Sequence, residues 1–371
     1  MQETHAGEED WELLTSFFPD EWKELAKETE ALKGLRQDKS AEDFLHVLLL
    51  HVGCGYSLRE TVTRARQAGL ADLSDVALLK RLRKSKEWLR ALCLRLLGEV
   101  GSEPVTTKEW CLVDSTLVKE PGQTGSQWRI HYCLQWPGLR CGHFKITAVE
   151  GRGNGESLRQ FPLRAGERVL ADRGFCRATD LHYAADCGAL TLVRLNPDAI
   201  RLETAAGELF PLLQRLSGLT RTGQVRSWPV QVALDGAAPI PVRLCVVRKS
   251  KAAIARALAK LRRKAQQGKS ALAPATLRYA EFVMVLTTFP AEEYPAALVL
   301  ECYRMRWQIE LLFKRFKQLA QLGHLPKYDD ESVHAWLYGK LFVALLTEKL
   351  IACARGFSPW GYDLDAPKRM A

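Results

Sequence analysis

The change of pattern near Pro104 constrains the fold more than any other feature of this 371-residue sequence. Before it, short helical segments carry helix-start signals, such as Ser40 three residues ahead of Asp43 and Ser57 three residues ahead of Glu60. After it, short apolar runs alternate with helical stretches. This order predicts an α/β fold whose sheet carries helices on its faces, preceded by an all-α region.

The strand-rich part has a definite order. Apolar, β-leaning runs lie at residues 110–113, 128–136, 143–150 and 168–171, then a helical stretch at 177–187 and a strand at 190–195. Strands are next expected at 200–209, 225–234 and 240–247, followed by a basic helical tract at 249–269. A strand at 282–288 and one long helix at 292–322 complete the pattern. We interpret residues 196–281 as a β-rich insertion.

The first 104 residues are expected to contain a helix-turn-helix arrangement. A helical stretch at 58–68 precedes a short turn, and Ser74 is a suitable cap for a second helix at 75–83. A basic cluster closes this second helix, formed by Lys80, Arg81, Arg83, Lys84 and Lys86. Such side chains either bind DNA phosphates or form a solvated face, and this segment alone does not separate the two.

Positive charge is concentrated in two parts of the chain, residues 51–105, with 10 Lys and Arg against 6 Asp and Glu, and residues 201–281. The net charge is +10, yet residues 1–50 hold 5 Lys and Arg against 13 Asp and Glu, whereas residues 201–281 hold 15 against 4. A polyanion such as nucleic acid is the partner that this excess favours. For the basic tract 249–269, a solvated face is an equal alternative.

Several protein classes are disfavoured. The best candidate for a membrane span, residues 335–352, is interrupted by Lys340, Glu348 and Lys349. The first residues are acidic and lack the basic and apolar regions of a signal peptide, so an intracellular protein is expected. Ten cysteines occur singly without a C-x-x-C pair, which indicates reduced, packed thiols rather than a zinc site or a disulfide framework.

Candidate catalytic groups lie at two strand ends and on the long helix. Asp114 and Asp172 each follow an apolar strand, and carboxylates at the carboxyl edge of a sheet project into the crevice where α/β proteins bind ligands. Aspartate after a strand is also a common turn former. On the helix, at about 100° per residue, one narrow stripe contains Tyr303, Arg306, Glu310 and Lys317.

Two strand-end aspartates and one helical glutamate are the oxygen ligands that hard divalent cations prefer. A pair of ions about 4 Å apart stabilises both the attacking and the leaving oxygen of a phosphoryl transfer. Arginine and lysine beside such a cluster are suited to hold a phosphodiester. We therefore predict that Asp114, Asp172 and Glu310 bind two Mg²⁺ or Mn²⁺ ions, with water or a DNA 3′-hydroxyl as the nucleophile.

These motifs resemble those of the DDE transposases of the insertion-sequence-4 family, which are bacterial cut-and-paste enzymes. The similarity rests on Asp114 in VDST, Asp172 in ADRGF and the signature Y-x2-R-x3-E-x6-K that ends at Lys317. A β-rich insertion between the second aspartate and the glutamate agrees with it. The resemblance covers residues 105–320 in detail and the N-terminal helices more loosely.

The resemblance implies a ribonuclease-H-like catalytic domain with a β-rich insertion, preceded by an all-α DNA-binding domain. Its parts would be residues 1–104 (DNA-binding), 105–195 with 282–330 (catalytic), 196–281 (insertion) and 331–371 (a C-terminal helical segment). Asp114, Asp172 and Glu310 would bind the metal ions. The DNA contacts would come from Tyr303, Arg306, Lys317 and Arg173. The enzyme would be cytoplasmic and nucleoid-associated, with no membrane partner.

By the same resemblance, the substrates are double-stranded DNA, namely the terminal inverted repeats of the transposon and the target. Members of the family nick each end, form and reopen a hairpin, and join the freed 3′-hydroxyl to the target as dimers. An aromatic ring often stacks on the base that is flipped for the hairpin. Phe282 is the candidate here, with a position in the core as its alternative. Trp307 and Trp336 are interpreted as core residues because their neighbours are apolar.

Two other functions are compatible with the sequence. One is a transposon-derived DNA-binding protein whose cleavage activity has lapsed, although the three retained carboxylates argue against it. The other is a ribonuclease-H-like DNA nuclease without strand transfer. DNA that stays uncut in Mg²⁺ or Mn²⁺ would favour the first, and cleavage without joined products would favour the second.

Overall fold

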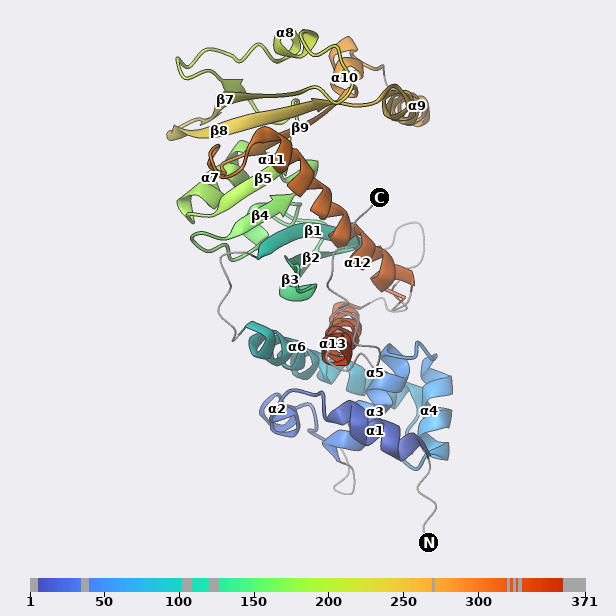
Figure 1. Ribbon diagram of the computed structural model, residues 1–371. Helices are drawn as coiled ribbons and strands as arrows, with labels where there is room; N and C mark the ends of the chain where they lie inside the picture. Colours follow the sequence, from blue (N-terminus) through green and yellow to red (C-terminus); the bar gives the residue numbers. More distant parts are fainter. Residues whose placement is uncertain are drawn as a thin grey trace.

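The computed structural model describes residues 6–34, 40–101, 109–119, 127–268, 271–318, 321–322, 325 and 329–355. Helices gather at one end of the molecule and a large mixed sheet forms the other end (Figure 1). The predicted α/β fold preceded by helices is therefore confirmed at this level. None of the helices in these ranges is long and apolar enough to cross a membrane.

The N-terminal helices are α1 (Ala6–Thr15), α2 (Trp22–Glu28), α3 (Ala41–Val52), α4 (Leu58–Gln67), α5 (Asp75–Lys84) and α6 (Lys86–Gly101). As predicted, the hydroxyls of Ser40, Ser57 and Ser74 accept hydrogen bonds from backbone N–H groups at the starts of α3, α4 and α5. The tight turn between α4 and α5 gives the expected helix–turn–helix order.

Most of the basic cluster is used in internal contacts, and its last member, Lys86, begins α6 and does not lie on α5. Arg83 pairs with Asp329 at 2.9 Å, and Lys86 pairs with Glu331 at 2.9 Å. Arg81 donates to the backbone carbonyl of Lys33 at 2.7 Å. These three cations therefore have internal partners, whereas Lys80 and Lys84 are exposed.

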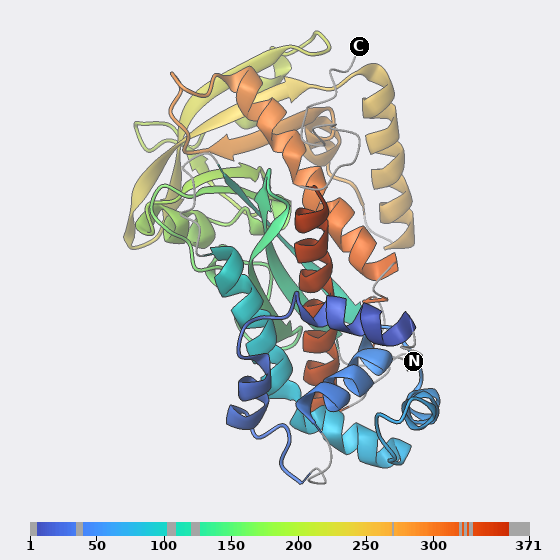
Figure 2. The ribbon, with the colours of Figure 1, turned by 60° about the horizontal axis from the view of Figure 1, so that its bottom comes forward.

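The C-terminal helix α13 (Asp330–Arg355) returns to the N-terminal helices and packs along α6 (Figure 2). It also reaches the sheet through Glu348, whose carboxylate accepts from the Tyr132 hydroxyl at 2.8 Å and from the Cys141 N–H at 3.1 Å. Burial raises the pKa of Glu348 to about 7. The predicted segment 331–371 is thus part of the helical unit as far as Arg355, and its remainder lies outside the described residues.

One nine-stranded sheet has the order β3-β2-β1-β4-β5-β9-β8-β7-β6. Its strands are β1 (Trp110–Lys119), β2 (Gln127–Trp136), β3 (Arg140–Ala148), β4 (Arg168–Ala171), β5 (Leu190–Arg194), β6 (Leu202–Glu203), β7 (Val225–Leu234), β8 (Ala237–Arg248) and β9 (Phe282–Thr287). The central strands β1, β4 and β5 are parallel, and their neighbours β2 and β9 are antiparallel to them.

Helices cover both faces of this sheet. The face that carries Leu112 and Leu170 belongs to the core that includes α11 (Ala296–Cys302) and α12 (Trp307–Gln318). The face that carries Val113 and Ala171 belongs to the core that includes α7 (Ala178–Asp186). Side chains alternate along a strand, so successive residues of β1 and β4 point to opposite faces of the sheet.

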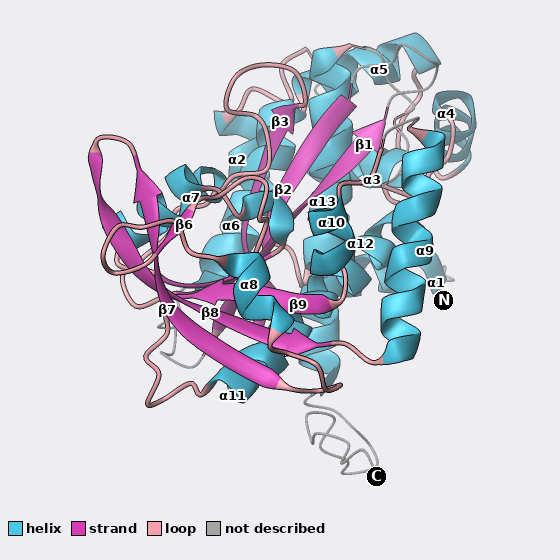
Figure 3. Cartoon of the chain, turned by 90° about the horizontal axis from the view of Figure 1, so that it is seen from above, coloured by secondary structure: helices cyan, strands magenta, loops and turns pink. Residues whose placement is uncertain are grey.

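The predicted insertion is continuous with the main sheet. Its strands β7 and β8 pair with each other, and β8 pairs with β9, so residues 196–281 extend the sheet and do not form a separate one. The segment also contains α8 (Leu212–Ser217), α9 (Lys251–Gln267) and α10 (Pro274–Tyr279), and α9 stands beside the sheet (Figure 3). The predicted strand at 200–209 is shortened to the two residues of β6.

The predicted long helix at 292–322 is wrong in its bounds and in its continuity, because α11 begins only at Ala296 and α12 ends at Gln318. A 3-10 turn at Tyr303–Arg306 separates α11 from α12. Residues 319–320 at its predicted end lie outside the described ranges.

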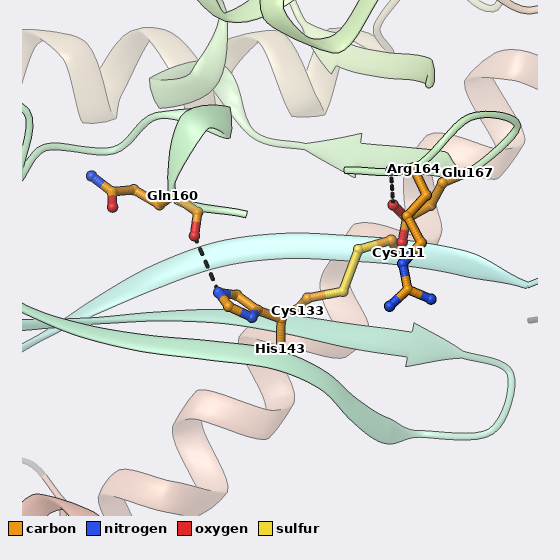
Figure 4. The surroundings of a disulfide bond; sticks show 6 residues. All are labelled: Cys111, Cys133, His143, Gln160, Arg164 and Glu167. Carbon is orange, nitrogen blue, oxygen red and sulfur yellow. Dashed lines mark hydrogen bonds between the residues drawn. A yellow bond between two sulfur atoms is a disulfide. The ribbon is translucent and has the colours of Figure 1, made fainter. Parts of the chain in front are cut away.

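The cysteine prediction is partly wrong. Cys111 of β1 and Cys133 of β2 form a disulfide with Cα atoms 5.9 Å apart (Figure 4). They lie two residues out of register on adjacent antiparallel strands, because Cys133 is opposite Val113. The other eight cysteines are free, and the buried ones are Cys93, Cys141, Cys176 and Cys245. Cys111 and Cys133 are 22 residues apart in the sequence and meet only because β1 and β2 pair, so no local sequence pattern indicates this disulfide.

Candidate active site

The two predicted strand-end aspartates lie next to each other, but only Asp172 follows its strand. The prediction is wrong for Asp114, because β1 continues past it to Lys119. Val113 of β1 is the register partner of Ala171 of β4 in a parallel pair, so Asp114 and Asp172 occupy equivalent places on neighbouring strands. Alternation from Leu112 and Leu170 directs both side chains to the α12 face of the sheet. The side chain of Asp172 is 36% exposed, so this carboxylate is open to a ligand.

Residues of the signature segment surround Asp172. The Tyr303 hydroxyl donates to Asp172 Oδ1 at 3.0 Å. Arg306 Nη1 lies 3.7 Å from Asp172 Oδ2, and its Nη2 donates to Glu310 Oε1 at 2.5 Å. One guanidinium group therefore contacts both carboxylates, which brings Glu310 of α12 to the aspartates of the sheet. Tyr303 and Arg306 are the first and last residues of the 3-10 turn, and both contact Asp172.

Asp114 has an unusual protonation equilibrium. Burial raises the pKa of its carboxyl from 3.8 to about 7, and the negative charges of Asp172 and Glu156 act in the same direction. The Ser115 N–H, which donates to Asp114 Oδ1 at 2.8 Å, and the Arg306 guanidinium oppose this rise. The protonated and charged forms of this carboxyl therefore coexist near pH 7, and only the charged form is suited to bind a cation.

The neighbouring groups respond to the same charges. Burial and the Asp172 carboxylate raise the pKa of the Tyr303 phenol, so it stays a hydrogen-bond donor. Burial alone would lower the pKa of Arg306, but Tyr303, Asp172 and Glu310 outweigh it and raise the pKa of the guanidinium. Arg306 is therefore a permanent positive charge among the carboxylates.

The carboxylates fit a divalent cation in donor type and position. Asp114 of β1 and Asp172 after β4 share one face of the sheet, and the Ser115 N–H and the Arg306 guanidinium favour the charged form of Asp114. Within the described ranges, no three His, Cys, Asp or Glu side chains converge closely enough to hold a metal as they stand. To bind a metal ion, Glu310 would have to break its ion pair with Arg306 and rotate toward the aspartates. Its side chain is exposed, which leaves room for this rotation.

Three other predicted site residues lie apart from this cluster. Lys317 is exposed two turns further along α12. Arg173 donates to Asn196 Oδ1 at 2.7 Å and pairs with Asp198 at 3.3 Å. Phe282 is only 2% exposed and lies in the core on the α7 face, with the Arg248 and Arg278 guanidinium groups against its ring. A base could not reach that ring, so the structure supports the core alternative for Phe282.

The prediction for Trp307 is wrong, whereas that for Trp336 is confirmed. Trp336 is 4% exposed, but Trp307 is 61% exposed, at the first position of α12 between Arg306 and Glu310. The helix turns Ile309, Phe313 and Phe316 toward the core and leaves the indole outside. Apolar neighbours in sequence do not establish burial when they lie on another face of the helix.

Sequence reasoning missed a polar group behind Asp114. The Arg129 guanidinium donates to the Ser115 hydroxyl at 3.0 Å and to Glu156 at 3.1 Å, and Ser115 donates to Glu156 at 3.2 Å. A Cβ added at Gly174 would collide with the Glu156 carboxylate, so this side chain also reaches the turn after Asp172. Glu156 thus lies beside both aspartate-bearing segments. No signal marks it, because it belongs to a glycine-rich loop.

Comparison with known proteins agrees with this geometry. The family described as "Transposase DDE domain" matches residues 150–346, which include Asp172 and Glu310. InsL of insertion sequence element IS186A from Escherichia coli (strain K12) is 33% identical over 352 residues, covering 92% of this chain and 93% of the relative. The transposase of IS421 from Escherichia coli is 33% identical over 353 residues, with the same coverage. The transposase of IS231F from Bacillus thuringiensis subsp. israelensis is 39% identical over 61 residues, or 16% of this chain and 13% of the relative. Since the family match spans more than half of the sequence and two of these relatives cover nearly all of it, the chain belongs to the DDE transposase family.

Proposed function

We propose that the protein is a cut-and-paste transposase of the insertion-sequence-4 type, which cleaves double-stranded DNA at transposon ends and joins the freed 3′-hydroxyl to target DNA. The observation that carries the proposal is the contact of one Arg306 guanidinium with both Asp172 and Glu310, beside Asp114 on the next strand. This contact brings Asp172 and Glu310, which are 138 residues apart in the sequence, to one place. We assign strands β1–β5 and β9 to a ribonuclease-H-like catalytic domain.

The proposed chemistry is phosphoryl transfer. When bound by Asp114, Asp172 and Glu310, two Mg²⁺ or Mn²⁺ ions would supply charge to the attacking and leaving oxygens. Tyr303 holds Asp172 in place through its hydroxyl. Before DNA arrives, Arg306 neutralises charge on the carboxylates. Because the Glu310 side chain is exposed, it can rotate away from this ion pair, and the Arg306 guanidinium can then contact a phosphate oxygen. Lys317 and Arg173 are proposed as further phosphate contacts.

A hairpin step needs an aromatic surface for an unpaired base. We assign this role to Trp307 in place of Phe282, since the Trp307 ring is 61% exposed and adjacent to Arg306. Stacking of a base on an aromatic ring is worth about 1–3 kcal/mol. A homodimer with one transposon end bound by each subunit completes the proposal.

The decisive experiment uses labelled DNA that carries the inverted repeats flanking the gene, with Mg²⁺ or Mn²⁺. Asp114→Asn, Asp172→Asn and Glu310→Gln are each expected to lose cutting while retaining end binding. Asp186→Asn is the matched control, because Asp186 is an exposed aspartate of α7 on the opposite face of the sheet. Normal cutting by any of the three variants would remove that residue from the site.

The same assay separates the alternatives. Cleavage by the wild type without joined products would identify a nuclease, and binding without cleavage would identify a lapsed transposase. Trp307→Ala should reduce the hairpin product relative to the first nick, whereas Trp307→Phe should retain it. Equal hairpin yields from Trp307→Ala and the wild type would assign the indole to another role.

A further inference from the structure

Helix α9 is an exposed cationic element that the catalytic site does not use. It has 17 residues, no buried side chain and no acidic residue. Its cations are Lys251, Arg256, Lys260, Arg262, Arg263 and Lys264. Within the described part of the chain, none of these six side chains has an ion pair or a hydrogen bond. Six like charges held close together without partners favour an anionic ligand.

The cations and the apolar residues of α9 lie on different faces. Ile254, Leu258 and Leu261 are half-buried and share one face of the helix. At about 100° per residue, Arg256, Lys260 and Arg263 lie together on the opposite face, and all three are exposed. Along the axis this stripe extends about 10 Å, at about 1.5 Å per residue. One DNA strand presents about three phosphates over that length, at about 3.4 Å each.

The sheet places α9 at the edge that carries the catalytic aspartates. Arg248, the last residue of β8, pairs with Phe282, the first residue of β9. Since β9 is antiparallel to β5, this end of β8 lies at the carboxyl end of β5, which is parallel to β4 and β1. The helix begins three residues later, after the Ser250 cap. Figures 2 and 3 show α9 on the side of the molecule where α12 also lies.

Two further cations connect the site with the start of α9. The Arg194 guanidinium, at the end of β5, is close enough to act on both the Tyr303 hydroxyl and the Lys249 ammonium. Lys249 donates to the Ala280 carbonyl at 2.7 Å, which fixes it between β8 and β9. Positive charge therefore continues along the sheet edge from Arg306 through Arg194 and Lys249.

We propose that the outward face of α9, formed by Arg256, Lys260 and Arg263, binds the phosphate backbone of the DNA duplex whose cleavage site lies at Asp114 and Asp172. The proposal rests on the proposed function and adds a second contact surface to it. No large apolar side chain of α9 is exposed, which distinguishes this face from the aromatic-rich centre of a protein interface.

The test is the salt dependence of binding to a labelled mixed-sequence duplex, followed by anisotropy from about 50 to about 200 mM salt. The triple variant Arg256→Gln/Lys260→Gln/Arg263→Gln should bind with a slope of log K against log salt that is shallower by about 2 to 3, at about 0.9 per lost phosphate contact. The matched control is Lys27→Gln/Arg164→Gln/Arg215→Gln, which removes three exposed cations from α2, the loop before β4, and α8. Its slope should equal that of the wild type.

Each outcome bears on one proposal. An unchanged slope in the α9 variant, with cleavage by the wild type and none by Asp114→Asn, would overturn the α9 proposal alone. A shallower slope without any cleavage by the wild type would leave α9 as a DNA-binding surface and remove the proposed function. If the α9 variant instead sediments as a smaller species with an unchanged slope, the face binds a second copy of the chain. Retention of the wild-type slope by Arg256→Lys/Arg263→Lys would support a contact made by charge.

Discussion

Asp114→Asn should stabilise the folded protein while it abolishes cleavage. The wild-type carboxyl has a pKa of about 7 in the folded chain against 3.8 when unperturbed, mainly because it is buried. Below pH 3.8 it is protonated in both states and has no effect on stability. As the pH rises toward 7, the unfolded chain loses this proton first, so the free energy of unfolding falls. Asparagine does not titrate and avoids that loss.

The magnitude follows from the same two values. The difference between 3.8 and about 7 corresponds to about 4 kcal/mol at most, at about 1.4 kcal/mol per tenfold change in proton affinity. Asparagine forgoes the attraction of Arg306, so we expect a net gain of about 1–3 kcal/mol above pH 7 and almost none near pH 4. Thermal unfolding of both proteins at a series of pH values measures this difference.

Magnesium should reduce or reverse the difference in stability between Asp114→Asn and the wild type. A cation bound at 100 times its Kd stabilises the folded state by about 2.7 kcal/mol, and this gain requires the Asp114 carboxylate. Added Mg²⁺ should therefore raise the Tm of the wild type and leave that of Asp114→Asn unchanged. Asp180→Asn, which alters a buried aspartate of α7 on the other face, should keep the response to Mg²⁺. A pH-independent difference between Asp114→Asn and wild type would refute the burial argument, and an equal Mg²⁺ response would refute the ligand assignment.

Three further predictions concern neighbouring contacts. Tyr303→Phe removes the hydrogen bond to Asp172, worth about 1.5–3 kcal/mol for a charged acceptor, so single-turnover cleavage should slow by at least about tenfold with little change in DNA affinity. Glu348→Gln removes a buried carboxyl with a pKa of about 7, and its amide can accept from the Cys141 N–H and donate to the Tyr132 hydroxyl oxygen, so its Tm should exceed that of the wild type above pH 7, whereas Glu348→Ala should lower the Tm at every pH. Gly174→Ala should slow cleavage through collision with Glu156, and Glu156→Ala in the same chain should restore it; failure of the rescue would locate the defect elsewhere.

Local chemistry made the sheet and the helix starts predictable. β4 and β7 occupy the expected residues because each is an apolar or alternating run between turn formers. Asp172 directly follows β4 as predicted, whereas Asp114 lies within β1, which continues to Lys119. Ser40, Ser57 and Ser74 cap their helices through contacts only three residues long.

The errors arise where tertiary contacts decide the outcome. Periodicity predicts one helix at 292–322, but burial of Tyr303 against Asp172 accompanies a 3-10 turn there. Trp307 is exposed because α12 buries the face that carries Ile309, Phe313 and Phe316, and the indole lies on another face. Glu156 lies on a loop and is held by hydrogen bonds to Ser115 of β1 and Arg129 of β2. The Cys111–Cys133 bond depends on the register of the same two strands. These contacts join residues that no short window of sequence contains.

The return of α13 to α6 has a consequence for how the molecule assembles. In the sequence, α6 precedes and α13 follows all the strands of the sheet. The helical unit is therefore completed only when two segments far apart in the sequence come into contact. Closing so long a loop is entropically costly and slow compared with local helix formation. An excised fragment of residues 1–104 would lack α13 and expose the part of α6 that packs against it, so we expect the helical unit to be less stable alone than in the complete chain.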